Sequence, residues 1–378
     1  MDPRTGLPVV GMVGGGQLAR MTHQAAIALG QSLRVLATDP EDGAALVVGD
    51  VRIGHHTDLS ALREFAKGCD VVTFDHEHVP GEHIRTLAAE GVTLRPGADA
   101  LRYSQDKRAM RERLTAMGLP VPRWAPVRAT TDIEQFAAQA GWPVVVKAVR
   151  GGYDGRGVWV VRSAAEAPPD TELIVEERVP LARELSAVVA RSPFGQVAAY
   201  PVVETVQRDG ICVEVVAPAP GLAEERAVEA QRLAIELTTA LDVVGLLAVE
   251  LFDTGDRLLV NELAMRPHNS AHWTIEGART SQFEQHLRAV LDYPLGDTSA
   301  TAPVVVMANV LGGEPGGMSV DERLHHLFAA DPGAKVHLYG KKVRPGRKIG
   351  HVTVLGDDLD RTRERAARAA RWLREGHE

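Results

Sequence analysis

Residues 246–270 read LLAVELFDTGDRLLVNELAMRPHNS. Two apolar runs on either side of a Gly-containing turn predict a β-hairpin of Leu246–Phe252 and Arg257–Leu263, with the turn at residues 253–256. The second strand leads directly into a polar segment, Arg266–Ser270. We therefore expect the polar groups of the hairpin and of this segment to meet at one site.

Two carboxylates, Glu250 and Glu262, stand on the facing strands of this hairpin. Their even separation places both on one face only if the loop holds an odd number of residues, and a three-residue loop with Gly255 in the left-handed conformation meets that condition. Facing carboxylates repel each other unless a cation lies between them. Mg²⁺ suits such a pair because it prefers a few carboxylate oxygens plus phosphates and water, with Mn²⁺ as a substitute. The alternative is an ordinary hairpin with solvated acids.

Length and composition indicate a globular protein of two or three domains, because 378 residues exceed one ordinary core. A net charge of −8 argues against nucleic-acid or membrane-surface partners for the whole chain. Cys69 and Cys212 are the only cysteines, so the sequence implies neither a disulfide framework nor a cysteine zinc site. The N-terminus has no signal-peptide pattern and no run of transmembrane length occurs, so we expect a cytoplasmic protein.

The first hundred residues alternate between strands and helices, which predicts an open parallel α/β sheet. The expected strands are residues 7–13, Ser32–Thr38 and Asp70–Phe74, and a helix runs to about Leu29 after the first strand. The glycines of Gly14–Leu18 open that helix, and a helix N-terminus after glycines binds phosphate. With Asp39 ending the second strand, an NAD-binding protein remains an alternative.

A glycine-rich loop, Gly151–Gly157, lies between two expected strands, Trp142–Val149 and Gly157–Arg162. Its glycines let backbone N–H groups approach an anion, and Lys147 on the preceding strand adds a positive charge. The loop suits a flap over a nucleotide, and the alternative is a long hairpin turn. A helix is expected just before this unit, at about residues 104–117, capped by Ser104.

Two further segments suit nucleotide or phosphate ligands. Residues 175–179 run from a strand into an extended linker that can present backbone groups to an adenine edge, and Glu184 can accept from ribose hydroxyls. Residues 341–348 are strongly basic and suit a sugar phosphate. In both places the alternative is a solvated charged surface. The chain from about residue 296 is rich in strands and ends in a helix at Asp360–Arg374.

The order of glycine flap, adenine-binding strand, acidic hairpin and Arg-containing tail resembles the ATP-grasp superfamily. Within it, the chain resembles the N5-carboxyaminoimidazole ribonucleotide synthetases, which use ATP and bicarbonate in purine biosynthesis. The resemblance spans nearly the whole chain and is carried by Gly14–Leu18, Gly151–Gly157, Asn261–Leu263, Arg266–Ser270, His272–Thr274 and Arg344–Lys348.

The resemblance implies an α/β ATP-grasp fold in three domains and a homodimer. The implied domains are an open parallel α/β domain at 1–100, a two-lobed ATP-grasp domain at 101–295 with its flap lobe at about 123–188, and a small strand-rich domain at 296–378. Glu250 and Glu262 would hold Mg²⁺. The residues implied to bind ATP are Arg102, Lys147, Gly152, Tyr153, Asp154, Gly155, Arg156, Gly157, Val158, Glu176, Glu177, Arg178, Val179, Glu184, Gln207, Asn261 and Glu262.

The second substrate implied is 5-aminoimidazole ribonucleotide, with bicarbonate as co-substrate. The residues implied to bind the ribotide are Gly15, Gly16, Gln17, Leu18, Glu77, Tyr153, Arg156, His268, Asn269, Ser270, Lys341, Arg344, Arg347 and Lys348. The implied catalytic residues are Asp154, Arg266, His268 and Lys341. The chain departs from the family pattern at Gln207, where His is usual, and at residues 75–78, where paired glutamates and Asn are usual.

The expected reaction activates bicarbonate with the γ-phosphoryl group of ATP, and a closed flap would protect the carboxyphosphate from water. Either Asp154 or His268 would accept the proton lost by the ribotide amine. A different ATP-grasp ligase, formate-dependent or amino-acid-ligating, is a further alternative, against which the Arg344–Lys348 motif argues.

Overall fold

The computed structural model describes residues 1–152, 155–168, 171–313 and 317–376. Its N-terminal part is a parallel four-stranded sheet in the order β3-β2-β1-β4, as the sequence predicts, although β3 was not anticipated. Both faces of β1 are apolar, and Val10 and Met12 are fully buried. The elements are β1 (Val9–Val13), α1 (Gln17–Ala28), β2 (Ser32–Ala37), β3 (Asp50–Ile53), α2 (Leu59–Ala66), β4 (Val71–Phe74) and α3 (Gly81–Ala89).

Two helices connect this sheet to the rest of the molecule, α4 (Ala98–Gln105) and α5 (Lys107–Ala116). The expected single helix capped by Ser104 is wrong, because the chain leaves the helical conformation at Asp106. The Asp106 carboxylate accepts a hydrogen bond from Ala109 N at 2.8 Å, so it is the N-cap of α5. Lys107 thereby becomes the first residue of α5 and is only 8% exposed.

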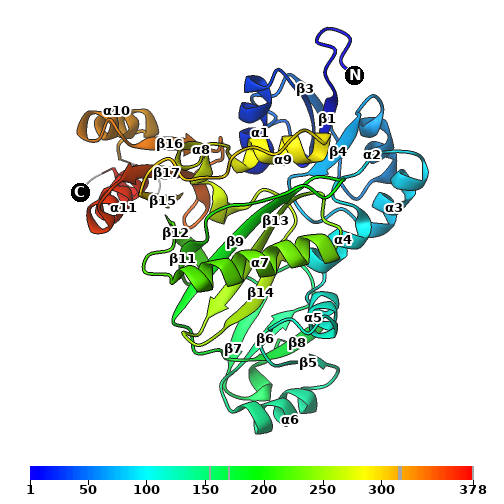
Figure 1. Cartoon of the computed structure of the whole chain (residues 1–378), viewed down its shortest axis with the longest axis vertical. Helices are drawn as coiled ribbons and strands as arrows, with labels where there is room; N and C mark the ends of the chain where they lie inside the picture. The colour runs from blue at the N-terminus through cyan, green and yellow to red at the C-terminus, as the bar shows by residue number, and fades with distance from the viewer. Residues whose placement is uncertain (153–154, 169–170, 314–316, 377–378) are drawn as a thin grey trace.

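A small antiparallel sheet forms the flap lobe at the bottom of Figure 1. Its strand order is β5-β8-β6-β7, and α6 packs on β5 and β8. The two strands expected on either side of the glycine loop are present as β6 and β7. The elements are β5 (Trp124–Val127), α6 (Thr130–Ala140), β6 (Val144–Ala148), β7 (Val158–Val161), η1 (Ala164–Glu166) and β8 (Leu173–Glu177).

A nine-stranded sheet runs through the rest of the chain in the order β14-β13-β9-β11-β12-β15-β17-β16, with β10 paired to β9. The strand-rich C-terminal segment extends this sheet, because β15 pairs with β12. The strands are β9 (Arg183–Arg191), β10 (Val197–Ala199), β11 (Val203–Arg208), β12 (Ile211–Ala217), β13 (Gly245–Asp253), β14 (Leu258–Ala264), β15 (Val304–Leu311), β16 (Lys335–Leu338) and β17 (Lys348–Gly356).

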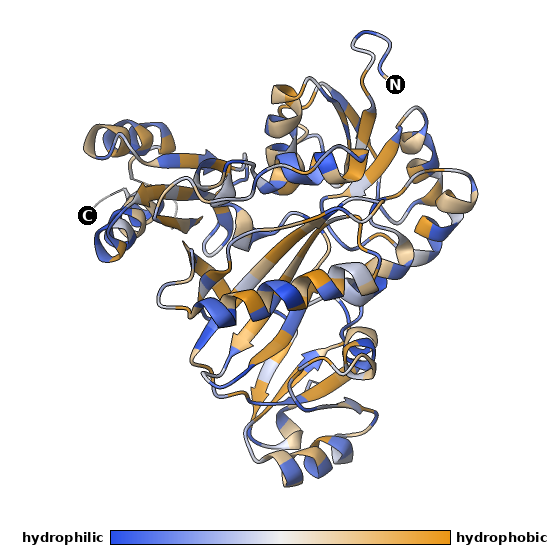
Figure 2. Ribbon diagram, viewed as in Figure 1, coloured by the Kyte–Doolittle hydropathy of each residue, from blue (hydrophilic) through white to orange (hydrophobic). Residues whose placement is uncertain are grey.

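Helices cover this large sheet, with α7 lying across β9 and β13, and α11 packing on β15 and β17 (Figure 1). Hydrophobic residues line the strands, whereas α7 alternates hydrophobic and hydrophilic residues around its surface (Figure 2). The remaining elements are α7 (Glu224–Ala240), η2 (Asn269–Ala271), α8 (Thr274–Gly277), α9 (Gln282–Leu291), α10 (Val320–Ala330) and α11 (Leu359–Glu375).

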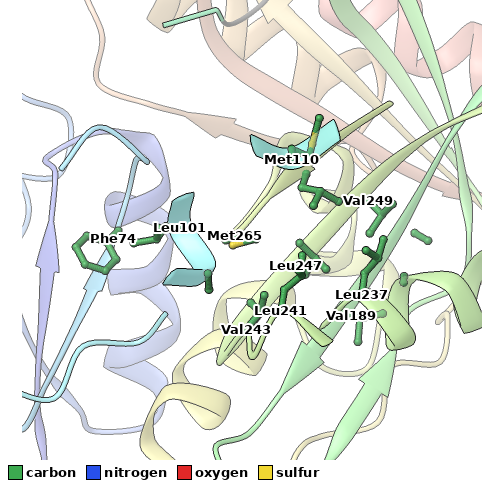
Figure 3. Close-up of a cluster of buried hydrophobic side chains, with 14 of the residues drawn as sticks. Phe74, Leu101, Met110, Val189, Leu237, Leu241, Val243, Leu247, Val249 and Met265 are labelled. Atoms are coloured by element: carbon green, nitrogen blue, oxygen red, sulfur yellow. The ribbon is translucent and has the colours of Figure 1, made fainter. Parts of the chain in front are cut away.

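One hydrophobic cluster joins the N-terminal sheet to the central sheet (Figure 3). Phe74 of β4, Leu101 of α4 and Met265 after β14 all belong to it, and each is at most 1% exposed. Because this core is continuous, polar residues on the two sheets have fixed relative positions. Within the described residues, no helix has both the length and the apolar character needed to cross a bilayer.

Candidate active site

The acidic hairpin forms from β13 and β14, and Glu250 is the direct cross-strand partner of Glu262. The expected three-residue loop is wrong. Asp253 pairs with Leu258, which leaves a four-residue loop closed by a hydrogen bond from Thr254 N to Arg257 O of 3.1 Å. Gly255 is left-handed, as expected, with φ of 92°.

A β-bulge restores the facing arrangement that an even-numbered loop would destroy. Leu251 pairs with Val260 and Glu250 pairs with Glu262, so Asn261 is the extra residue. Its backbone carbonyl accepts from Arg111 Nη2 at 2.8 Å, and its side-chain oxygen accepts from Lys147 Nζ at 3.0 Å. These two cations therefore hold the bulge in place.

A buried cation cluster, Lys107, Arg111 and Lys147, lies beside the hairpin. Arg111 and Lys147 both pair with Glu176, at 2.7 and 2.8 Å, and the Glu176 side chain is 2% exposed. Burial alone would raise the pKa of Glu176, but Arg111 and Lys147 together lower it to about 2. Burial lowers the pKa of Lys147, an effect that Glu176 opposes. The Glu176 side chain is thus committed to internal ion pairs.

The two hairpin carboxylates have different surroundings. Burial would raise the pKa of Glu262, but the ammonium of Lys107, which contacts its carboxylate, and the charges of Lys147 and Arg111 together lower it. Burial raises the pKa of Glu250, and the negative charges of Glu262 and Glu184 raise it further. The Glu262 side chain is 41% exposed, so a ligand can reach its carboxylate.

This donor set fits a divalent cation that the protein holds with two carboxylates. In the described part of the chain, no three acidic, His or Cys side chains form a ready-made metal cage. An ion bound by Glu250 and Glu262 would therefore take its other ligands from phosphate and water, which is the habit of Mg²⁺. A cation there would also relieve the repulsion that raises the pKa of Glu250.

His268 is a neighbour of Glu250, whereas Lys107 of the cation cluster contacts Glu262. Its Nδ1 accepts from Ser270 N at 3.4 Å and lies 2.8 Å from Ser270 Oγ, which in turn lies 2.7 Å from Ser186 Oγ. A backbone N–H can only donate, so the neutral ring carries its proton on Nε2, 3.6 Å from Glu250 Oε1. Burial, and then the charges of Arg266 and Lys348, lower the pKa of His268 to about 3.

The opening glycine loop meets a carboxylate at the end of β4. Gly14 has φ of 111°, and Gly16 N donates to the buried Asp75 carboxylate. A Cβ on Gly16 would lie 2.5 Å from Asp75 Oδ2, so glycine is required there. Burial raises the pKa of Asp75, while Gly16 N and the charge of Arg266 oppose this. One amide expected to face the ribotide phosphate is thus already engaged.

The basic segment 341–348 returns to this glycine loop, as the sequence predicts. Lys341 Nζ contacts Gln17 Oε1, and Lys342 pairs with Glu41 at 2.5 Å. Arg266 pairs with Glu77 at 3.3 Å, and Glu77 also accepts from Met265 N at 2.6 Å. The N-terminal part of the chain thus contacts both the basic segment and the segment after the acidic hairpin.

The described part of the glycine flap rests on the β11–β12 hairpin. A Cβ built on Gly210 would lie 2.7 Å from Gly155 Cα, and both glycines have φ of 76°. Gln207 lies at a β-bulge in the same hairpin. Tyr153 and Asp154, expected at the reacting end, lie outside the described residues.

Three family models match consecutive parts of the chain. They are the ribonucleotide synthetase preATP-grasp domain at residues 7–105, the ATP-grasp domain at 112–283 and the phosphoribosylaminoimidazole carboxylase C-terminal domain at 305–365. A protein of Mycobacterium tuberculosis (strain ATCC 25618 / H37Rv) named N5-carboxyaminoimidazole ribonucleotide synthase is 63% identical over 98% of this chain and 88% of its own length. The chain belongs to the N5-carboxyaminoimidazole ribonucleotide synthase family.

Other members of this family agree with the assignment. The Corynebacterium ammoniagenes synthase is 48% identical over 97% of this chain and 92% of its own length. The synthetase structure from Thermus thermophilus superposes with a TM-score of 0.87 at 41% identity, covering 96% of this chain and 98% of the other. The Aspergillus clavatus synthase, solved with ADP and 5-aminoimidazole ribonucleotide, has a TM-score of 0.87 at 32% identity, covering 97% and 98%.

Family membership confirms the three-domain ATP-grasp architecture and an ATP-grasp ligase, and it overturns the NAD-binding alternative. Several expected site residues have other partners in this structure. Glu177 pairs with Arg123 at 2.8 Å, and the Asn269 side chain exchanges hydrogen bonds with that of Asn309, at 3.0 and 2.8 Å. Arg102 is exposed on α4, whereas Lys107 reaches the hairpin.

Sequence reasoning missed Lys107 and Arg111 as site residues of this synthase-family chain. Both lie on one face of α5, four residues apart, and Ala109, Met110 and Leu114 of the same helix are buried. A charged residue amid buried apolar positions was the available signal, because buried cations in proteins are almost always paired with an acid.

Proposed function

We propose that this chain carboxylates the exocyclic amine of 5-aminoimidazole ribonucleotide, using ATP and bicarbonate, and releases N5-carboxyaminoimidazole ribonucleotide, ADP and phosphate. The observation that carries the proposal is the cross-strand pair Glu250 and Glu262, together with the contact between the basic segment and the opening glycine loop. The first supports a phosphoryl-transfer centre, and the second supports a site for another anionic substrate.

ATP lies between the flap lobe and the large sheet in this proposal. Lys147 neutralises phosphate charge, Glu184 accepts from the ribose, and residues 176–179 present the strand edge to adenine. Glu184 is suited to accept hydrogen bonds near Lys147, whose charge opposes the rise in its pKa that burial causes. The described flap residues 155–158, Gly152, Arg102 and Gln207 complete the nucleotide site.

Glu250, Glu262 and the side-chain oxygen of Asn261 face the phosphate end of this nucleotide site. The two carboxylates would hold Mg²⁺, or Mn²⁺ in its place, and the ion would supply Lewis-acid stabilisation of phosphoryl charge. Lys107 keeps Glu262 ionised, and the Nε2–H of His268 points at Glu250. The protein thus presents Glu262 as a carboxylate in advance, whereas ionisation of Glu250 is favoured once a cation is bound.

The ribotide occupies the cleft between the N-terminal sheet and the basic segment. Lys341, Arg344, Arg347 and Lys348 bind its phosphate together with residues 15–18, while residues 268–270 and Glu77 line its ring. Asp75 caps the Gly16 amide, so the positive charge needed for the phosphate comes mainly from the basic segment.

The proposed reaction has two steps. A bicarbonate oxygen attacks the γ-phosphorus, ADP leaves, and Lys147 and Arg266 neutralise the developing charge. The ribotide amine then attacks the carboxyl carbon of carboxyphosphate, phosphate leaves, and a base takes the amine proton. Nδ1 of His268 accepts from Ser270 N and its Nε2 carries the ring proton, so we assign the base role to Asp154.

The decisive experiment measures ADP release with Mg-ATP and bicarbonate, with and without the ribotide, and detects the carboxylated product by mass spectrometry. Ribotide-stimulated ADP release that depends on bicarbonate supports the proposal. Release stimulated by formate or an amino acid in the same assay would assign another ATP-grasp ligase activity.

The proposal also includes domain boundaries at residues 100/101 and 295/296, a homodimer and a cytoplasmic location with the nucleotide substrates. Light scattering on the purified chain tests the homodimer, with a molar mass of twice 40.7 kDa as the expected result.

A further inference from the structure

Helix α9 carries two fully buried glutamines that bind backbone groups in the same way. Gln282 Oε1 accepts from His268 N at 2.8 Å, and its Nε2 donates to His268 O at 2.9 Å. Gln285 Oε1 accepts from Gly296 N at 2.7 Å, and its Nε2 donates to Gly296 O at 2.9 Å. The two side chains are each 0% exposed. The two glutamines differ in the peptide that they bind. Gln282 binds the peptide of His268, whose ring faces Glu250, whereas Gln285 binds Gly296, which lies after α9 and pairs with neither strand of the acidic hairpin.

The amide of Gln282 has a single orientation that satisfies its neighbours. Its Nε2 also donates to Nδ1 of the fully buried His272 at 2.8 Å, and its backbone N donates to Thr274 Oγ1 at 2.9 Å. A flipped amide would place its NH₂ against the N–H of His268, which is repulsive. His272 therefore accepts at Nδ1 and carries its proton on Nε2. These contacts fix the backbone of residue 268 from the side of α9.

The ring of His268 is fixed from the other side by the central sheet. Ser270 Oγ lies between His268 Nδ1 and Ser186 Oγ, at 2.8 and 2.7 Å, and Ser186 is the β9 neighbour of Glu250. His268 Nε2 is 3.6 Å from Glu250 Oε1. Peptide and ring together thus join α9 to the carboxylate, and a shift of the peptide moves the ring away from Glu250.

We propose that Gln282 is a positioning residue, which holds the Nε2 edge of His268 3.6 Å from Glu250 and thereby restricts the orientation of that carboxylate for the divalent cation. This inference rests on the proposed function, since Glu250 is a cation ligand only there. Groups that orient a ligand from outside the coordination sphere typically change metal affinity or activity by about 10-fold to 100-fold when removed. Gln285, with the same chemistry on another peptide, has no such effect.

The test compares Gln282→Met with Gln285→Met in the full chain. Methionine fills nearly the same volume but makes neither hydrogen bond, so each variant loses its backbone contacts without creating a large cavity. Mn²⁺ affinity is measured by electron paramagnetic resonance with a non-hydrolysable ATP analogue, and thermal unfolding is recorded alongside. We expect Mn²⁺ binding to weaken about tenfold in Gln282→Met and to change less than twofold in Gln285→Met.

Two further measurements separate positioning from general loosening. In Gln282→Met, kcat falls by about tenfold or more at saturating Mg²⁺ while the KM for the ribotide changes little. In ¹⁵N-histidine spectra, the signals of His268 and His272 shift in Gln282→Met and stay in place in Gln285→Met. Gln282→Met leaves His268 N and His272 Nδ1 without their described partner, since His268 O still accepts from Ala271 N, and Gln285→Met does the same to Gly296 N and O. With two buried groups affected in each variant, we expect similar decreases in the unfolding midpoint.

Equal Mn²⁺ affinity in the two variants, whether both are unchanged or both are weakened, overturns the inference. The same holds if the Gln282→Met effect on Mn²⁺ binding disappears when the variants are compared at equal distance below their unfolding midpoints. Failure of the wild-type chain to bind Mn²⁺ with nucleotide is a different result, because it rejects the proposed function itself and the inference with it.

Discussion

Glu262 and Glu250, the two carboxylates of the acidic hairpin, have identical side chains but opposite electrostatic surroundings. On the α5 side, Lys107 contacts Glu262, and Arg111 and Lys147 lie close by, so its pKa is lowered despite burial. On the β9 side, burial and then the charges of Glu262 and Glu184 raise the pKa of Glu250, and its neighbour His268 is a neutral imidazole. The protein's own charges therefore favour the ionised form of Glu262, whereas Glu250 needs a further cation to favour its ionised form.

The largest expected effect comes from removing the buried guanidinium on the α5 side. Arg111→Met leaves Glu176 with Lys147 alone and removes two hydrogen bonds to the Asn261 bulge and Val260. We expect a loss of about 3–5 kcal/mol in the free energy of unfolding, measured by urea denaturation. The control is Arg63→Met, which breaks an exposed pair with Glu90 and should change little. Equal effects of the two substitutions would contradict a special role for the buried cluster.

The second largest effect is expected on the rate of ADP release. Glu262→Gln keeps the shape of the hairpin but removes one cation ligand, so ribotide-dependent ADP release should fall by at least about a hundredfold. Glu229→Gln, on an exposed face of α7, serves as the control. A Glu262→Gln variant that retains most of its activity would refute the assignment of this carboxylate as a metal ligand.

When no divalent ion is bound, removing the charge of Glu250 and removing the charge of Glu262 should shift the unfolding midpoint in opposite directions. The pKa of Glu250 is raised on folding, so its ionisation costs stability, and this cost grows as pH rises above the unfolded value of about 4.3. Glu250→Gln should therefore raise the unfolding midpoint by about 2 °C at pH 8 in EDTA, with little change at pH 4. Glu262→Gln should lower it, because Lys107 loses its partner. A shift of the unfolding midpoint in the same direction in both variants would contradict the proposed difference between Glu250 and Glu262.

The smallest expected effect concerns the close contact between Gly155 of the glycine flap and Gly210 of the β11–β12 turn. Asn tolerates the left-handed φ of Gly210, but its Cβ would approach Gly155 Cα to 2.7 Å, so the flap cannot close fully. Gly210→Asn should raise the KM for ATP roughly threefold and release ADP without equivalent carboxylated product. In Gly195→Asn, also at positive φ, a Cβ meets no described atom within 4 Å, and coupling should be normal. If both variants form one carboxylated product for each ADP released, the contact at Gly210 is not needed for flap closure.

Much of the site was visible in local sequence patterns. The acidic hairpin, the opening glycine loop, the glycine flap and the basic segment each combine turn-forming residues with a charge pattern within a short stretch. The parallel N-terminal sheet follows from apolar runs alone, because strands buried on both faces need no polar alternation. The structure then brings the basic segment to the glycine loop, through Lys341 and Gln17.

Where prediction failed, the cause was a contact between distant segments. The bulge at Asn261 depends on Arg111 and Lys147, which lie 150 and 114 residues away in sequence. The break at Asp106 is completed by a hydrogen bond from Lys107 N to Val149 O of 2.9 Å. The alternation of residues along a hairpin predicts which side chains share a face only if neither strand holds an extra residue. It therefore cannot predict a bulge that cations from distant segments stabilise.

The amino-acid sequence alone thus indicates most of the elements, the family resemblance and the charge of the candidate site residues, because hydrophobic period, glycine placement and charge are local properties. Tertiary packing alone settles which glutamate is ionised, which amide Asp75 occupies and which peptide Gln282 holds. Those outcomes depend on burial and on charges a few ångströms away, and both arise only when distant segments meet.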